Sequence, residues 1–219
     1  MAVVLRRFSD ITVSTRPTAA VAIKAVSSAQ RHIGLVYSKG ENLWLLHLAW
    51  HYDLRNEFLG PTYFLVEHKF TPPRMRQVAA RCRQIAKANP RGLPFAFSYP
   101  NGCFDGETGR YLFASSQIGL TCATFVLAVF EVAGLKLLEM ESWRERDDDD
   151  QWQQGVLSHL RGGLDDGKVT QSHIHDVERQ VGAFRCRPEE VAGSTASETH
   201  PIQFELAVRL GEQVLARMN

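Results

Sequence analysis

Short, mainly apolar runs recur along the first third of the chain and are separated by polar segments. The runs at residues 32–37 and 42–47 flank the segment Ser38-Lys39-Gly40-Glu41. Two such runs separated by a short glycine-containing segment are typical of a β-hairpin. Residues 63–67, which follow a turn containing Gly60 and Pro61, predict another strand. Residues 94–99 predict a further short strand.

From residue 71 onward the apolar residues recur with a helical period. Thr71 and the two prolines after it predict a helix start, and Pro90 predicts its end. The apolar stripe of this helix consists of Met75, Val78, Ala79, Cys82, Ile85 and Ala86. A second helix begins at Cys122 and ends before Gly134, and it is apolar on nearly every side. Such a helix is usually buried against a sheet.

The composition becomes strongly charged after residue 140, which suggests two parts. Residues 1–140 are interpreted as the core domain, and residues 141–219 as a charged linker with a helical C-terminal extension packed on it. The block at residues 147–150, four aspartates, is interpreted as a solvated loop. Residues 171–181 and 201–218 predict helices. The expected fold class is α+β, an antiparallel sheet packed on the buried helix that carries Cys122.

Composition and charge narrow the classes of partner. The 219 residues include 44% hydrophobic residues and have a formal net charge of +1. A net charge this small predicts no general affinity for nucleic acid or for anionic lipid. No run reaches the ~18 apolar residues that cross a bilayer. The N-terminal residues lack the pattern of a secretory signal, so a cytoplasmic protein is expected, although a substrate of signal-independent secretion would look the same.

The four cysteines are scattered and form no Cys-x-x-Cys pair. They are Cys82, Cys103, Cys122 and Cys186. This spacing excludes a zinc site built from two cysteine pairs, and it favours free thiols over a disulfide framework. His173 and His175 lie on different faces of their predicted helix, so a metal site there is not expected. We therefore expect neither a metal nor a cofactor.

The hairpin carries a histidine on each of its strands. With an even-length loop centred on Lys39-Gly40, Ser38 pairs with Glu41, and His32 lies directly opposite His47. Opposed residues on one face have Cβ atoms roughly 4.5–5.5 Å apart. An odd-length loop would send the two imidazoles to opposite faces. The even loop is favoured because Gly40 supplies the positive φ that tight hairpin turns need.

Cys122 is the candidate nucleophile. A cysteine in the first turn of a helix lies near unpaired backbone amides and the positive end of the helix dipole. A nearby imidazole can then activate the thiol, and a second polar group can orient that imidazole. The amides of the helix start, with Gln117 as a weak candidate donor, are suited to bind an oxyanion.

Each of these residues also has a purely structural interpretation. A cysteine at the start of an apolar helix is often a packing residue, and a histidine in a strand is often a hydrogen-bonded one. His51 and Asp53, which lie beyond His47, are interpreted as residues at the rim of the site; the alternative is that either of them is a third polar member of it. From spacing alone the catalytic and structural interpretations stay open.

The segments around these residues resemble a known family. Residues 30–37, residues 45–48 and the run Thr121-Cys122-Ala123-Thr124-Phe125-Val126 are similar to the lecithin:retinol acyltransferase-like group, which are circularly permuted relatives of the NlpC/P60 papain-like hydrolases. The resemblance covers residues 20–135. It implies a permuted papain-like fold with His32 as the base, His47 as the orienting residue and Cys122 as the nucleophile. The run around Cys122 departs from the Asn-Cys-Glu-His-Phe pattern of the acyltransferase branch, which favours the broader class.

The function expected from the sequence is a cysteine peptidase or amidase with a Cys-His-His triad and a thioester intermediate. Its substrate would be a peptide, an amide or another acyl compound. Two alternatives stay open: a thiol acyltransferase that resolves the same thioester with an amine or alcohol, and a catalytically silent interaction domain. The sequence carries no signal for the oligomeric state.

Overall fold

A six-stranded antiparallel sheet forms the centre of the molecule. The computed structural model describes residues 2–113, 118–164, 167 and 169–218. The strands are β1 (Leu5–Arg7), β2 (Ala19–Ala25), β3 (Arg31–Lys39), β4 (Asn42–Trp50), β5 (Asp53–Phe58) and β6 (Phe64–Val66). They lie in the order β1-β6-β2-β3-β4-β5, and each neighbouring pair is antiparallel. The fold class is α+β.

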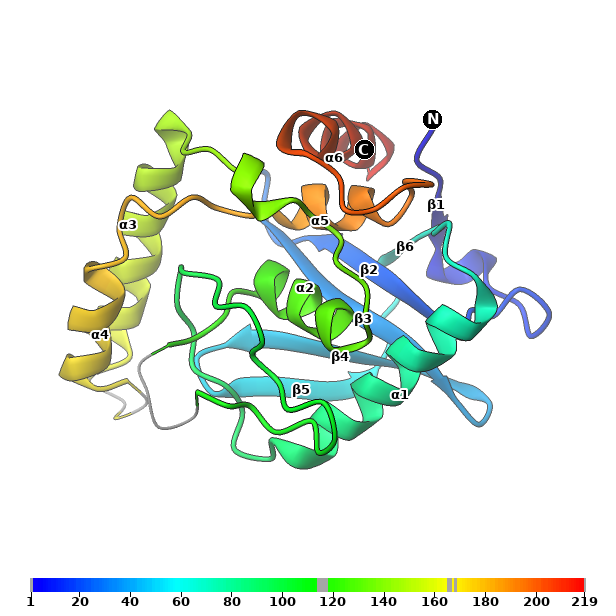
Figure 1. Ribbon diagram of the computed structural model, residues 1–219, viewed down its shortest axis with the longest axis horizontal. Coiled ribbons are helices and arrows are strands. Elements are labelled where there is room, and N and C mark those ends of the chain that lie inside the picture. The colour runs from blue at the N-terminus through cyan, green and yellow to red at the C-terminus, as the bar shows by residue number, and fades with distance from the viewer. Residues whose placement is uncertain (1, 114–117, 165–166, 168, 219) are drawn as a thin grey trace.

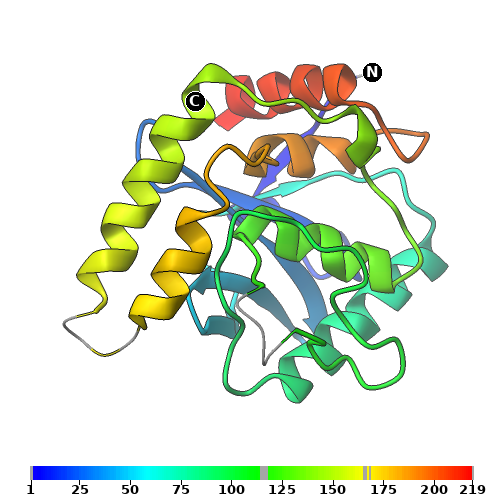
Figure 2. The ribbon, with the colours of Figure 1, turned by 60° about the vertical axis from the view of Figure 1, so that its left-hand side comes forward.

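The described helices gather mainly on one side of this sheet. They are α1 (Pro72–Ala88), α2 (Cys122–Val132), α3 (Asp147–Gly162), α4 (Gln171–Glu178), α5 (Pro188–Ser194) and α6 (Phe204–Met218). Helices α1, α2 and α5 pack on the sheet, α6 packs on α5, and α3 pairs with α4 beyond one end of the sheet (Figures 1 and 2). Among the described residues, none of the helices is long and apolar enough to cross a membrane.

The two faces of the sheet are covered differently. The helix face carries the side chains of Ile33, Leu35, Tyr37, Leu46 and Leu48, which share one core with α1, α2 and α5. The other face, here called the loop face, carries Ala20, Ala22, Val36, Leu43 and Leu45, which pack against Leu59, Tyr63 and Leu65. Side chains alternate between faces along a strand, so His32 and His47 belong to the loop face with Val36 and Leu45.

Two helix predictions are confirmed in detail. Helix α1 buries Met75, Val78, Ala79, Cys82 and Ile85, as the apolar stripe predicted. Helix α2 begins at Cys122 and is buried at nearly every position. The residue after its C-cap, Gly134, has φ +76°, a conformation that glycine adopts without strain and that ends the helix.

Two predictions of local structure are wrong. Residues 94–99 form no strand, because their backbone bonds lie elsewhere: Leu120 N donates to Pro94 O, and Phe97 N donates to the side chain of Gln180. The four aspartates form the first turn of α3 rather than a solvated loop. Acidic side chains stabilise the N-terminal turn of a helix. Asp149 is buried there and pairs with Arg146 and Arg187.

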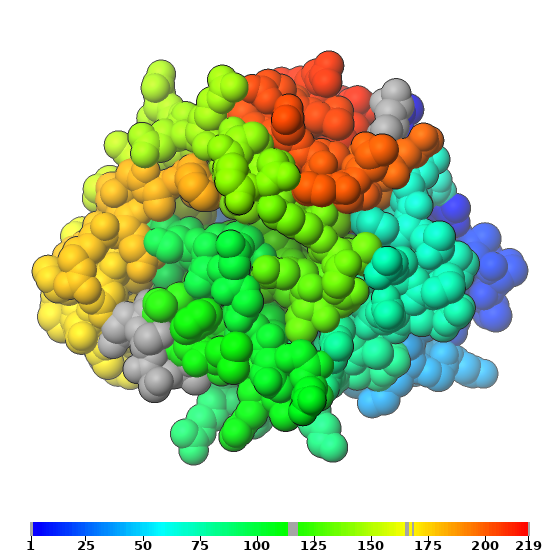
Figure 3. All heavy atoms as spheres, viewed as in Figure 1, coloured from blue at the N-terminus to red at the C-terminus, as the bar shows by residue number. Residues whose placement is uncertain are grey.

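The C-terminal part of the chain contributes to the central core. Val191, Ala192, Leu210 and Val214, from α5 and α6, belong to the same buried cluster as α2 and the sheet. In the space-filling view, the yellow atoms of α3 and α4 and the red atoms of α6 directly border the green and yellow-green atoms of the preceding segments (Figure 3). Packing is therefore continuous across residue 140.

Candidate active site

The register of the hairpin differs from the predicted one by two residues. Lys39 pairs with Asn42, so the turn residues are Gly40 and Glu41, and Gly40 has φ +59°. The prediction that His32 lies directly opposite His47 is therefore wrong. The shift is even, however, and an even shift leaves every side chain on its face of the sheet. The two imidazoles share the loop face as diagonal neighbours.

Gly34 makes the contact between the imidazoles possible. Continuing the register beyond the pair Leu35–Leu46 sets His47 against Gly34, and a Cβ atom on Gly34 would lie 2.7 Å from Cβ of His47. The imidazole of His47 occupies space that a side chain would fill. As a result, Nε2 of His32 lies 2.7 Å from Nδ1 of His47, with the ring planes at 76°.

Glu57 on β5 extends this contact into a chain of three side chains. Its Oε1 lies 3.2 Å from Nε2 of His47. A carboxylate only accepts hydrogen bonds, so His47 donates from Nε2 and accepts at Nδ1. His32 then donates from Nε2, which leaves its Nδ1 unprotonated. The chain thus selects the tautomer in which Nδ1 of His32 can act as a base.

Burial keeps both imidazoles neutral. Burial, the neighbouring His47 and the charges of Lys24 and Arg55 lower the pKa of His32 to about 3. Burial also lowers the pKa of His47, although Glu57 acts in the opposite direction. The two cations face the pair from the neighbouring strands, since Lys24 pairs with His32 and Arg55 with His47. At neutral pH, both imidazoles are therefore unprotonated, and the low pKa of His32 makes it a weak base in the resting protein.

Cys122 is held at the first position of α2 by a reciprocal threonine cap. Thr121 Oγ1 accepts from Thr124 N at 3.1 Å, and Thr124 Oγ1 accepts from Thr121 N at 2.8 Å. The segment before the cap passes close to another loop, because a Cβ atom on Gly119 would lie 2.5 Å from Pro94 O. These contacts fix where the helix starts and where its first side chain points.

The sulfur of Cys122 lies where β3 and β4 stop pairing. The β3–β4 ladder ends at Leu35–Leu46, although both strands continue. Burial raises the pKa of the Cys122 thiol, while the backbone N–H of Ile33 and the charge of Arg185 act in the opposite direction. The resting pair is therefore a neutral thiol and a neutral imidazole. Cys122 is partly exposed, and the other three cysteines are buried.

One cavity of about 140 Å³ contains both predicted reactive residues. Cys122 and His32 line it, together with aromatic residues and two arginines: Trp50, Phe95, Trp152, Arg31 and Arg185. His47 is not among the lining residues and stands behind His32. Among the described residues, no hydrogen bond joins the thiol to either imidazole. The structure thus brings both residues to one cavity, although α2 packs on the helix face of the sheet and the imidazole of His32 lies on the loop face, paired with His47.

The remaining candidates fall into three groups. Gln117, the candidate oxyanion donor, lies outside the described residues. Cys82 and Cys103 are buried, and burial raises the pKa of each thiol to about 12. Cys186 lines the same cavity as Cys122, but it is also buried, which raises its pKa. Cys122 is thus the accessible thiol of the four.

His51 belongs to a second pair of imidazoles. The interpretation of His51 as a rim residue is wrong, because it is buried and its Nδ1 accepts from Phe95 N at 3.2 Å. Its ring stacks on His173, with centroids 4.0 Å apart. His175, by contrast, is exposed. Within the described part of the chain, no group of three His, Cys, Asp or Glu side chains is placed to hold a metal ion.

Sequence reasoning missed Glu57 and Arg185. Glu57 lies on β5, a largely polar edge strand without the alternation that reveals a half-buried strand. Arg185 lies between the predicted helices at residues 171–181 and 201–218, where no pattern predicts an element. A scan of the chain against protein-family models finds no match, and no curated protein and no solved structure matches it either.

Proposed function

We propose that this protein is a cysteine-dependent hydrolase that cleaves an amide bond through Cys122, within a fold of the circularly permuted papain-like type. One observation carries the proposal: His32, already oriented by His47, lines the same cavity as the accessible thiol. A nucleophile, a base and a group that orients the base are the parts that thiol catalysis needs.

The first half of the reaction forms a thioester. The sulfur of Cys122 attacks the amide carbonyl carbon, and the thiol proton moves to Nδ1 of His32. The tetrahedral intermediate collapses with cleavage of the carbon–nitrogen bond, and the leaving amine takes the proton from His32. The acyl group is then bound to sulfur, and His32 is neutral again.

Water completes the cycle. His32 removes a proton from water as the oxygen attacks the thioester carbonyl, and the carbon–sulfur bond breaks. The proton returns to the departing sulfur, and the acid product leaves. His47 and Glu57 hold the ring of His32 in one orientation and keep the proton on its Nε2, so both are positioning residues. The backbone N–H groups at the start of α2 supply donors for the oxyanion.

A covalent trapping experiment tests this proposal. The protein is mixed with 4-nitrophenyl acetate, quenched in acid, and mapped by peptide mass spectrometry for an acetyl thioester. We expect acetylation on Cys122, absent in Cys122→Ala and strongly slowed in His32→Asn. Cys186→Ala is the matched control, since it removes a second thiol from the same cavity, and it should leave the acetylation of Cys122 unchanged.

Two results would contradict the proposal. One is acetylation of Cys122 no faster than that of a free cysteine peptide, which would support a catalytically silent domain. The other is acetylation that persists in Cys122→Ala. Adding a primary amine then separates hydrolysis from transfer: recovery of only the acylated amine, with no free acid, would replace the hydrolase by an acyltransferase.

A further inference from the structure

The cavity that contains Cys122 is lined by positive charge. Arg31 and Arg185 are the charged side chains among its described lining residues, and no acidic side chain accompanies them. Nη1 of Arg31 donates to backbone carbonyls of its own turn, while its buried Nε has no hydrogen-bond partner. A cation in a partly desolvated cavity is costly unless an anion joins it.

Arg185 is positioned by its ring contact. Its guanidinium lies over the indole of Trp152, 3.8 Å from the ring centroid. This stacking uses one flat face of the guanidinium and leaves the N–H edge for other partners. Within the described part of the chain, Arg185 forms no ion pair, unlike its neighbours Arg146 and Arg187.

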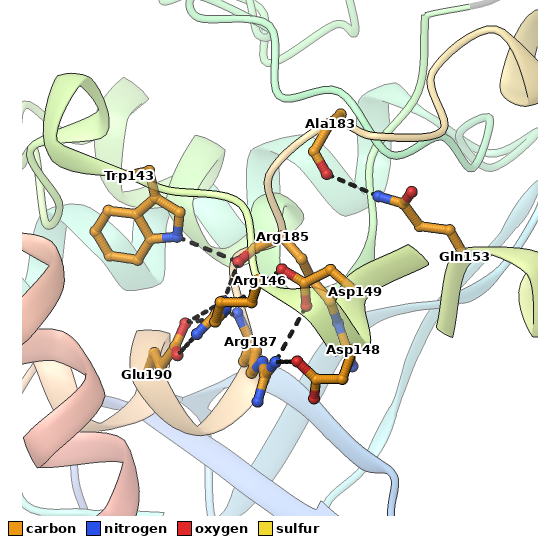
Figure 4. A network of polar contacts seen from close by, with 9 residues as sticks. All are labelled: Trp143, Arg146, Asp148, Asp149, Gln153, Ala183, Arg185, Arg187 and Glu190. Atoms are coloured by element: carbon orange, nitrogen blue, oxygen red, sulfur yellow. Dashed lines mark hydrogen bonds and ion pairs between the residues drawn. The ribbon is translucent and has the colours of Figure 1, made fainter. Parts of the chain in front are cut away.

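The backbone at Arg185 is fixed by a polar network (Figure 4). Its carbonyl accepts from Trp143 Nε1 at 3.2 Å and from Arg146 Nη2 at 2.6 Å. Arg146 in turn pairs with Glu190, and Arg187 pairs with Asp148. The network pairs Arg146 and Arg187 with nearby carboxylates. The charges of Glu189 and Asp149 also act on Arg185, but among the described residues neither carboxylate forms an ion pair with it.

We propose that Arg185, with Arg31 beside it, binds an anionic group on the acyl part of the substrate, a carboxylate or a phosphate, next to Cys122. This inference rests on the proposed function and names its substrate class. A guanidinium edge matches both anions with two parallel hydrogen bonds. Its partner in the resting protein is not the thiol, because burial keeps Cys122 protonated. The substrate anion then supplies the direct ion pair that Arg185 does not form within the described part of the chain.

A binding experiment tests the anion subsite without relying on catalysis. Glutarate, its neutral diamide glutaramide and inorganic phosphate are titrated into the protein, with the fluorescence of the cavity tryptophans as the signal. We expect an anion to bind more tightly than glutaramide, and Arg185→Met to weaken that binding about 10- to 100-fold, the range of a charge-assisted hydrogen bond. Cys122→Ala should bind like the wild type. The stronger of glutarate and phosphate identifies the anion.

Matched variants separate the subsite from general effects of charge. Arg144→Met removes the same charge from an exposed arginine paired with Glu205, and it should leave binding unchanged. Arg185→Lys keeps the charge without the planar edge and should show an intermediate loss. Circular dichroism confirms that each variant is folded. Equal binding by the wild type and Arg185→Met, or no preference for either anion over glutaramide, would overturn the inference.

A kinetic experiment connects the subsite to the reaction. Glutaryl and valeryl 4-nitroanilides differ by a terminal carboxylate and share the scissile bond. Arg185→Met should reduce kcat/KM about 10-fold or more for the glutaryl compound and less than about twofold for the valeryl compound. An equal fall for both compounds, carried by kcat, would mean that Arg185 stabilises the thiolate and would overturn substrate recognition. Anion binding without any hydrolysis would instead contradict only the proposed function.

Discussion

The described part of the chain contains two pairs of touching imidazoles that differ in how the rings meet. His32 and His47 meet edge-on through a hydrogen bond of 2.7 Å, whereas His51 and His173 stack with their planes at 33°. Stacked rings do not use each other's nitrogens. Edge-on rings do, and that contact decides which nitrogen of His32 keeps its proton.

The surroundings of the two pairs differ as well. His51 accepts from Phe95 N and thereby holds the segment against which the start of α2 is packed. The cavity that His51 lines has no cysteine among its described lining residues. His32 shares its cavity with Cys122. The two similar pairs thus have different surroundings: one supports a loop, and the other lies at the cavity that contains Cys122.

The largest expected effect separates the two pairs by activity. Replacing His32 with Asn removes the base, and we expect kcat/KM for the anilide substrate to fall about 10²- to 10⁴-fold. His51→Asn keeps an acceptor near the position of Nδ1, and we expect kcat/KM to fall no more than about threefold, because His51 only holds a loop. Similar losses in the two variants would show that the distinction between the pairs is wrong.

Gly34→Ala tests the space that only the first pair requires. The added Cβ meets Cβ of His47 at 2.7 Å, so His47 must move away from His32. We expect a loss of about 1–3 kcal/mol in the free energy of unfolding, measured in urea, together with reduced activity. Gly155→Ala is the control: nothing lies near its Cβ position in α3, and we expect a gain of about 0.4–1 kcal/mol. An unchanged stability of Gly34→Ala would contradict the packing described here.

The two pairs should behave alike toward acid. The folded pKa of His32 is about 3 and that of His51 about 4, both below the ordinary value of 6.5. At any pH between the folded pKa of each histidine and 6.5, the unfolded state binds more protons than the folded state. The free energy of unfolding therefore decreases as the pH falls through this interval. Each histidine contributes at most about 1.4 kcal/mol per pH unit. Urea unfolding between pH 7 and pH 4 should show a shallower slope in both Asn variants, and an unchanged slope would indicate an imidazole that is charged in the folded protein.

The smallest expected effect concerns the orienting residue. Glu57→Gln preserves size but removes the charge that favours protonated His47. Because Gln can present its N–H to His47, the tautomer chain is weakened, and we expect kcat to fall about tenfold with KM unchanged. Nitrogen NMR of the imidazoles should show a changed tautomer population for His32. A change in KM alone would assign Glu57 to substrate binding instead.

Part of the site could be predicted from the sequence because it depends on local periodicity. The even number of residues in the predicted hairpin loop placed His32 and His47 on one face of the sheet. The cap and the apolar stripe placed Cys122 at the start of a helix. The two-residue error in register arose from the turn, where Gly40 occupies the first of the two turn positions rather than the second. Parity survives an even shift, whereas direct opposition does not.

The chain by itself determined the main helices, the shared face of two imidazoles and the accessible cysteine at a helix start, since each follows from the spacing of neighbouring residues. Only the tertiary structure decided which residues contact His47 and which residues line the cavity around Cys122. Glu57 reaches His47 from a polar strand with no periodic signal, and Arg185 and Trp152 reach the cavity from a region distant in sequence. Contacts between distant segments depend on how whole elements pack, and no local pattern of side chains encodes that.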